Sequence, residues 1–229
     1  MADLFHEDVP DEFIDQVFAS MALTPRHRFL ILTKRPERMR TYLIWERPDL
    51  VRQGAVQNQM DFRTHRDAWP LPNVWLGTSV EDQRSADERI PHLLATPAAV
   101  RFVSAEPLLG PVEVSSWLYR GHPVNTLLQS KRIDWLIVGG ESGPRARPMD
   151  LAWARSLVAQ CRAAGVPVFV KQLGAEAYDD VPVSESDIPD HPLLLRPAGT
   201  RRDEWPMRES HGRDPSEWPE DLRIREWPK

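Results

Sequence analysis

Apolar residues occur along this chain in short runs, and each run gives way to polar residues at its carboxyl end. The runs are rich in β-branched and aromatic side chains and are bounded by proline, glycine or charged residues. These features are typical of buried β-strands. The predicted strands cover about residues 28–33, 73–76, 100–104, 133–138 and 166–170.

Apolar positions at helical spacing predict helices between these strands and one helix ahead of them. In the last helix, Asp150 is a suitable N-cap and Gly165 stands where the helix should stop. Pro91 lacks a backbone N–H, so we expect the helix that follows Glu81 to end or kink near Ile90. Apart from the helix that follows Glu81, the predicted helices cover about residues 11–21, 37–44, 115–119 and 151–164.

The order of strand, helix and strand, with a crossover of about thirty residues, implies parallel neighbouring strands joined by right-handed connections. We therefore predict an α/β fold built on a parallel sheet or barrel. The regular pattern covers residues 1–174, which we expect to form one domain. From residue 175 to 229 the pattern dissolves, and we expect an irregular, proline-rich and tryptophan-rich extension packed on that domain.

The tripeptide Glu-Trp-Pro occurs three times in the extension, at residues 204–206, 217–219 and 226–228. The unequal spacing excludes a structural repeat. We expect each tryptophan to pin an extended tail to the domain, because a buried indole contributes roughly 2–3 kcal/mol of transfer free energy. The alternative is a peptide-like interaction tail. A second irregular stretch, residues 45–72, is long enough to be a functional lid or a family-specific insertion.

Polar residues follow the predicted strands at their carboxyl ends. In a parallel sheet or barrel these ends lie on one face, and the loops of that face build active sites. The sequence therefore predicts one polar rim with a ligand pocket. Its candidate residues are Lys34, Ser79, Glu81, Ser104, Glu106, Gly139, Gly140, Glu141, Ser142 and Lys171.

Charge and rim position suggest roles for these residues. Glu106 and Glu141 are the candidate catalytic residues and would receive an amine or hydroxyl groups of a small molecule or nucleotide. Lys34 or Lys171 would meet a carboxylate or phosphate. The glycines would allow close approach of the backbone.

Other interpretations of the same residues stay open. Glu141 also fits a tight turn in which it pairs with Arg145 or Arg147. Together with Glu81 and Glu106 it also fits a metal-dependent hydrolase, because hard cations take oxygen ligands.

Composition narrows the function classes. The chain has 229 residues and a net charge of −5, so as a whole it weakly repels a polyanion such as a nucleic acid. The basic residues between 26 and 40 are a candidate patch for nucleic-acid contact, and the alternative for them is a solvated face. It has no apolar stretch of about 18 residues and no signal-peptide pattern, so we expect a cytoplasmic protein without a membrane span. Cys161 is the only cysteine, which excludes an internal disulfide and a three-thiolate site, and its helical position predicts a core residue.

Six blocks of the sequence, in this order, carry a family resemblance. The chain resembles an uncharacterised bacterial and phage protein family whose members are often labelled as phage proteins or domains of unknown function. The blocks span residues 3–10, 32–36, 73–77, 101–108, 138–143 and 169–172.

This resemblance implies a β/α barrel similar to that of radical S-adenosylmethionine enzymes, in which a cysteine-rich region precedes the blocks found here. An iron–sulfur cluster and S-adenosylmethionine would accompany that region, so we expect no radical chemistry from this chain alone. The fold expected here is an incomplete (β/α) TIM-barrel-like parallel barrel. Five strands cannot close such a barrel, so we expect an open sheet edge. A chain with such an edge should either be marginally stable or pair with a second copy or a partner chain. A non-catalytic interaction protein or a decayed gene product is the alternative.

Overall fold

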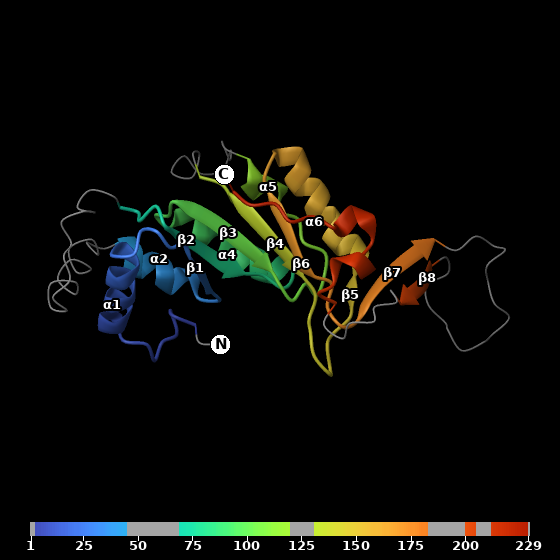
Figure 1. Cartoon of the computed structure of the whole chain (residues 1–229), viewed down its shortest axis with the longest axis horizontal. Coiled ribbons are helices and arrows are strands. Elements are labelled where there is room, and N and C mark those ends of the chain that lie inside the picture. The colour runs from blue at the N-terminus through green and yellow to red at the C-terminus, as the bar shows by residue number, and fades with distance from the viewer. Residues whose placement is uncertain (1–2, 45–68, 120–130, 183–199, 205–211, 229) are drawn as a thin grey trace.

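The computed structural model describes residues 3–44, 69–119, 131–182, 200–204 and 212–228. Its centre is a five-stranded parallel sheet with the order β1-β2-β3-β4-β6 (Figure 1). All five predicted strands and their parallel direction are thus confirmed, while among the described residues the sheet is open and no strand pair closes it into a barrel. The strands are β1 Phe29–Thr33, β2 Val74–Ser79, β3 Val100–Ala105, β4 Trp135–Gly139 and β6 Val168–Gln172.

Helices follow most of the strands, as the pattern predicted. None of the helices in the described ranges has the length and apolar character that a membrane span requires. The α-helices are α1 Asp11–Ala22, α2 Pro36–Ile44, α4 Gln83–Ala95, α5 Ser115–Leu118 and α6 Leu151–Ala164, and the 3-10 helices are η2 Pro215–Glu217 and η3 Glu220–Leu222.

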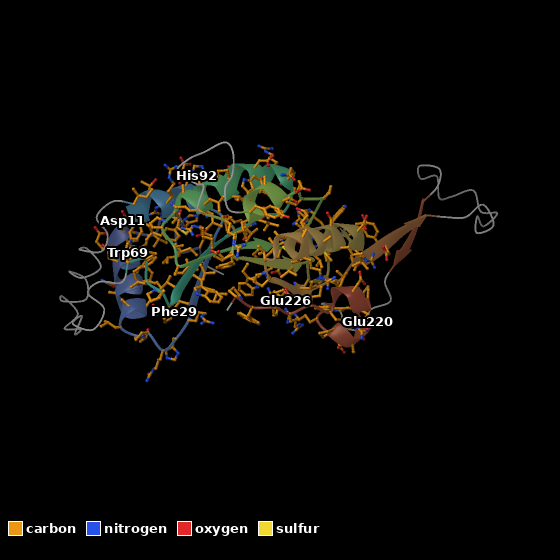
Figure 2. All side chains as sticks on the ribbon, turned by 90° about the horizontal axis from the view of Figure 1, so that it is seen from above. Asp11, Phe29, Trp69, His92, Glu220 and Glu226 are labelled. Atoms are coloured by element: carbon orange, nitrogen blue, oxygen red, sulfur yellow. The ribbon has the colours of Figure 1, made fainter. Side chains whose placement is uncertain are left out.

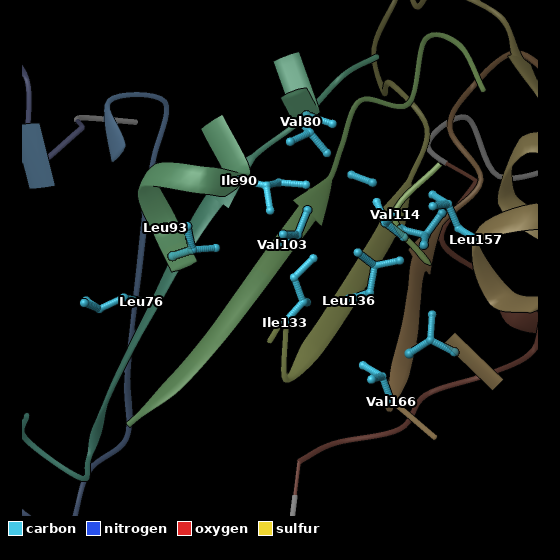
Figure 3. Packing of buried hydrophobic residues seen from close by; sticks show 14 of the residues in the cluster. Leu76, Val80, Ile90, Leu93, Val103, Val114, Ile133, Leu136, Leu157 and Val166 are labelled. Carbon is cyan, nitrogen blue, oxygen red and sulfur yellow. The ribbon is translucent and has the colours of Figure 1, made fainter. Parts of the chain in front are cut away.

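The main hydrophobic core lies between the helices and one face of the sheet. Leu76, Val103 and Leu136, from three neighbouring strands, point to the same side and are buried. They meet Ile90 of α4 and Leu157 of α6 (Figure 3). The strands are therefore held in register by side chains that alternate with those of the opposite face.

The opposite face carries an aromatic cluster. Trp75, Phe102 and Trp135 are each at most 4% exposed and form a second hydrophobic group. Phe169 of β6 packs against Trp135, with ring centroids 6.1 Å apart. Because both faces are apolar, the strands show the continuous apolar runs by which the sequence predicted them.

Of the two outcomes expected near Ile90, a helix end is wrong, because α4 continues through Pro91 to Ala95. Ile90 and Leu93 on either side are completely buried, whereas Pro91 is exposed. We attribute the continuity to these anchors, which hold both halves of the helix on the core. The carbonyl that loses its N–H partner lies four residues earlier, at exposed Asp87, where water can solvate it.

The predicted features of α6 are confirmed. The Asp150 carboxylate accepts a hydrogen bond from the backbone N–H of Ala152, and Gly165 adopts a left-handed conformation with φ 62°. Cys161 is fully buried in the core. Burial raises the pKa of its thiol to about 12, so the sulfur stays protonated.

The prediction of an irregular extension from residue 175 is wrong for its first part. A second, three-stranded sheet with the order β5-β7-β8 contains β5 Met149–Asp150, β7 Ala177–Pro182 and β8 Thr200–Glu204. Asp179 and Pro182, which lie in the stretch predicted to be irregular, belong to β7. The strand forms because its first residues pair with β5 and bury Ala177 and Tyr178, a contact that local composition does not reveal.

The end of the described chain returns to the central sheet. Trp218 is 1% exposed and donates its indole N–H to the carbonyl of Gly212 at 3.1 Å. Beyond it, the backbone pairs with the edge of β6. The Val170 N–H donates to the Ile224 carbonyl at 2.8 Å, and the Glu226 N–H donates to the Val168 carbonyl at 3.0 Å.

The terminal tryptophan covers the aromatic cluster. The ring of Trp227 lies 4.6 Å from that of Trp135, although Trp227 is 53% exposed. The expected pinning by a buried indole is confirmed for Trp218, whereas Trp227 contacts the aromatic cluster without being buried. Trp205 and the 45–68 part of the insertion lie outside the described residues. The chain thus covers the β6 edge, and no described strand pairs with the outer edge of β1.

Candidate functional site

The carboxyl ends of the five strands bring the predicted residues to one rim, where they form separate groups. One group surrounds Glu106, at the ends of β3, β4 and β6. A second surrounds Glu81, at the ends of β1 and β2. A third contains Glu141 and its partner Arg147. The rim is therefore polar as predicted, but its charges are already paired.

The Glu106 cluster consists of Glu106, Lys171, Gln172 and Arg213. The Nζ of Lys171 lies 3.0 Å from both carboxylate oxygens of Glu106, and the Nε2 of Gln172 donates to Oε1 at 2.9 Å. Gln172 also donates to the carbonyl of Gly140 at 3.0 Å and accepts from the Nε of Arg213 at 3.3 Å. The Glu106 side chain is only 16% exposed, whereas Lys171 is 54% exposed. The cluster thus places a shielded anion beneath an accessible cation.

Glycine at 139 makes room for the Glu106 carboxylate. A Cβ atom at this position would stand 3.1 Å from Cδ of Glu106 and 3.2 Å from its Oε1. At Gly140 a Cβ would stand 2.1 Å from the carbonyl oxygen of Leu173. The space beside Gly140 is therefore filled by the protein backbone.

Two further glycines complete this backbone contact. A Cβ on Gly174, which has φ 85°, would meet the Glu141 carbonyl at 2.6 Å. A Cβ on Gly212, which has φ 60°, would meet the Gly174 carbonyl at 2.2 Å. Three segments that are distant in sequence thus touch through their main chains, and we call Gly140, Gly174 and Gly212 the glycine contact.

The Glu81 cluster consists of Lys34, Glu81 and Arg89. Lys34 forms an ion pair with Oε1 of Glu81. The Nη1 of Arg89 donates to Oε2 of Glu81 at 2.8 Å and to the carbonyl of Ser79 at 2.9 Å. Glu81 is thereby clamped between a strand end and a helix, with 13% of its side chain exposed.

Asp3 ties the amino-terminal segment to the end of β1. Its carboxylate accepts hydrogen bonds from the Thr33 hydroxyl at 2.7 Å, the Lys34 N–H at 3.1 Å and the Arg35 guanidinium at 3.1 Å. Burial acts to raise the pKa of Asp3, but these hydrogen bonds, with one from the Phe5 N–H, outweigh burial and lower it. Asp3 thus sits at the rim as an anion.

The third group matches the tight-turn interpretation of Glu141. Its carboxylate accepts from the Arg147 backbone N–H at 2.9 Å and from the guanidinium Nε at 2.7 Å. These hydrogen bonds lower the pKa of Glu141. The pKa of Arg147 is raised first by Glu141 and to a lesser extent by the charge of Glu81.

The predicted serines lie outside the three charged groups. Ser79 and Ser104 are 5% and 3% exposed and lie within β2 and β3. Ser142 follows Glu141 in the loop and is half-buried. No hydrogen bond joins any of these hydroxyls to a described base.

The described residues contain no group of three His, Cys, Asp or Glu side chains placed to hold a metal ion. Glu81, Glu106 and Glu141 each face a Lys or Arg instead. The residues of this chain also do not fit an iron–sulfur cluster held by three thiolates, because its single cysteine, Cys161, lies buried on α6.

Sequence reasoning missed four residues of these clusters. Arg89 lies two turns into α4, and Gln172 enters the sequence analysis only as the end of the last resemblance block. Asp3 precedes every regular element, and its one signal was its place in the first resemblance block. Arg213 comes from the far end of the chain, and no local pattern connects it with Gln172.

Comparison with known proteins identifies a family for this chain but assigns it no function. Searches of curated proteins and of solved structures found no match. Residues 1–213 match the family model described as "Protein of unknown function (DUF5131)". That match covers more than nine-tenths of the 229 residues. The chain belongs to this DUF5131 family of proteins of unknown function.

Proposed function

We propose that this chain binds a small zwitterionic molecule, with S-adenosylmethionine as the leading candidate, at the Glu106 cluster. The observation that carries the proposal is the ion pair of a shielded Glu106 with an accessible Lys171 at the carboxyl ends of parallel strands. Ligands of open α/β sheets bind outside these strand ends.

A zwitterion can enter this ion pair without leaving a charge unpaired. The ammonium of the ligand would take the place of the Lys171 Nζ on Glu106, and the released Lys171 would bind the carboxylate of the ligand. Gln172 would continue to hold Glu106, since its Nε2 bonds the carboxylate independently of Lys171. A ligand with only a negative charge would be repelled by the carboxylate of Glu106, and a simple cation would leave Lys171 without a partner.

The resemblance to phage proteins and to radical S-adenosylmethionine barrels supports this choice of ligand and a TIM-barrel-like ancestry for the open sheet. Because the cysteine content does not fit a cluster, we propose binding by this chain and derive no radical step from it.

The test is isothermal titration calorimetry with S-adenosylmethionine, L-methionine and adenosine as probes. We expect S-adenosylmethionine and methionine to bind and compete with each other, and adenosine alone to leave the Glu106 cluster empty. Glu106→Gln should weaken binding about tenfold or more, because a charge-assisted hydrogen bond contributes about 1.5–3 kcal/mol. The matched control is Glu220→Gln, which removes a charge from the exposed start of η3.

Two results would overturn the proposal. One is the absence of heat with either zwitterion at millimolar concentration. The other is equal affinity of the Glu106→Gln variant and the unaltered chain, with both proteins shown to be folded by circular dichroism.

A second candidate function is self-association, which the outer edge of β1 favours. Leu30 on this strand is 42% exposed, and no described strand pairs with the edge. An exposed apolar edge strand pairs readily with another strand. Sedimentation velocity should show a dimer that Leu30→Lys dissociates, and a strictly monomeric unaltered chain would exclude this function.

A further inference from the structure

A cavity of about 400 Å³ lies outside the Glu106 cluster, among the amino end of α2, the middle of α4 and the amino-terminal segment near Glu7. Of the rim residues predicted from sequence, only Lys34 lines it. His92 of α4 also lines it and lies in the helix layer, away from Glu226 on the C-terminal segment (Figure 2). The volume falls within the range of small-ligand pockets.

Half-buried guanidinium groups form part of the wall. Arg89 uses Nη1 to hold Glu81 and Ser79, and Arg35 uses Nη1 to hold Asp3. Each guanidinium has five N–H donors, and Nη1 carries only two of them. The donors on Nε and Nη2 of both groups have no acceptor among the described residues. These donors suit the oxygens of a phosphate.

The start of α2 adds two main-chain donors. Pro36 has no N–H, and the N–H groups of Glu37 and Arg38 have no acceptor in the described part of the chain. The amino end of a helix favours negative charge, since its free N–H groups and dipole point outward. Lys34, 54% exposed, stands at the same end.

Four other lining residues, an imidazole and three carboxylates, suit hydroxyl groups. The Nδ1 atom of His92 is buried and has no hydrogen-bond partner among the described residues. Glu7, Glu37 and Glu88 are exposed and form no ion pair with a described residue. Carboxylates and an imidazole nitrogen accept hydrogen bonds from sugar hydroxyls. A long polyanion would meet these three acids, so a small ligand fits better.

We propose that this cavity binds a small phosphorylated sugar compound such as a nucleoside monophosphate. The phosphate contacts Arg35, Arg89 and the first amides of α2, and the hydroxyls contact the acids and His92. This site is independent of the Glu106 cluster, and the two share no residue.

Calorimetry with adenosine 5′-monophosphate, and with adenosine as the matched neutral probe, tests the proposal. We expect only the monophosphate to bind. Arg89→Lys keeps a cation for Glu81 but removes the spare donors, and should weaken binding about fivefold to tenfold. Arg84→Lys, on an exposed position of α4 outside the cavity, is the control and should bind as the unaltered chain does.

Lys34→Gln provides a second variant if Arg89→Lys does not fold, since Lys34 is exposed. It should weaken binding similarly because it removes a cation beside the amino end of α2. Equal binding of the monophosphate and adenosine, or unchanged binding in the folded cavity variants, would overturn the proposal. So would tighter binding of an oligoadenylate than of the monophosphate. Glu106→Gln should leave monophosphate binding unchanged. Loss of monophosphate binding in that variant would place the phosphate site at the Glu106 cluster and refute the cavity site.

Discussion

Lys171 and Glu106 meet across β4, with the lysine Nζ 3.0 Å from both carboxylate oxygens. Glu106 follows β3 and Lys171 lies in β6, so the ion pair spans the strand between them. It does so beside Gly139, where any Cβ would crowd the carboxylate. Because Gly139 has no side chain, residues from two strands that are not neighbours can form this ion pair.

Lys171→Met should lower the free energy of unfolding by only about 0–1 kcal/mol, the usual contribution of an exposed ion pair. Lys171 is 54% exposed, and Gln172 still holds Glu106 in its absence. Urea denaturation measures the change. A loss of more than about 2 kcal/mol would identify the pair as structural and remove its availability for a ligand.

Gly140→Ala should destabilise the fold by about 1–3 kcal/mol or more, as overpacking does. The added methyl group would overlap the Leu173 carbonyl, which is main chain and cannot rotate away. Gly110→Ala is the control, because its Cβ would find its nearest neighbour, Cβ of Asp82, at 4.0 Å. Thermal melts of both variants should separate clearly, and similar melting temperatures would contradict the close contact.

Trp218→Ala should cost about 3–5 kcal/mol of unfolding free energy, the range for removing a buried tryptophan. Trp227→Ala should cost about half of that or less, because the Trp227 side chain is 53% exposed and buries less area. Chemical denaturation of the two variants provides the comparison. A larger loss for Trp227 would show that the aromatic cluster, and not Trp218, anchors the segment.

Asp3→Asn should destabilise the protein at neutral pH and not in acid. The folded-state pKa of Asp3 is lowered, so its carboxylate contributes stability that is present above the unfolded pKa and lost as pH falls through the folded value. The difference in unfolding free energy between the two proteins should be constant at pH 6–8 and shrink below about pH 4. A difference that is independent of pH would exclude an ionised Asp3 as its source.

Cys161 should react with a thiol reagent only after unfolding. Burial raises its pKa to about 12 and removes its sulfur from solvent, so at pH 8 the native thiol is both protonated and inaccessible. Reagent absorbance in buffer and in denaturant measures the two rates. Rapid native labelling would mean that α6 opens locally.

The central sheet was predictable because its information is local. Each strand is an apolar run of its own, as in 135–139, and parallel order follows from the helices between the runs. The end of α6 was equally readable, since Gly165 supplies the left-handed residue that the stop requires. The helix end expected near Pro91 failed because buried neighbours in the tertiary structure outweighed a single lost hydrogen bond.

The second sheet and the pairing within the site could not be read in this way. β5 has two residues, too few for any periodicity, and it pairs with a strand that begins 27 residues later, at Ala177. The rim position of Glu106 was predictable from the strand before it. Its contacts with Gln172, and through Gln172 with Arg213, depend on how three distant segments meet.

The glycine contact of residues 140, 174 and 212 joins three loops beside the Glu106 cluster through their main chains. These three loops touch through main-chain atoms. Side-chain hydrogen bonds from Gln172 to the Gly140 carbonyl and from Trp218 to the Gly212 carbonyl hold them there. The side chains of Glu141 and Arg213, which flank this contact, face Arg147 and Gln172 instead of the glycines. An inserted or deleted residue in any of the three loops would therefore shift main-chain atoms that touch one another, and would carry Glu141 and Arg213 away from their partners.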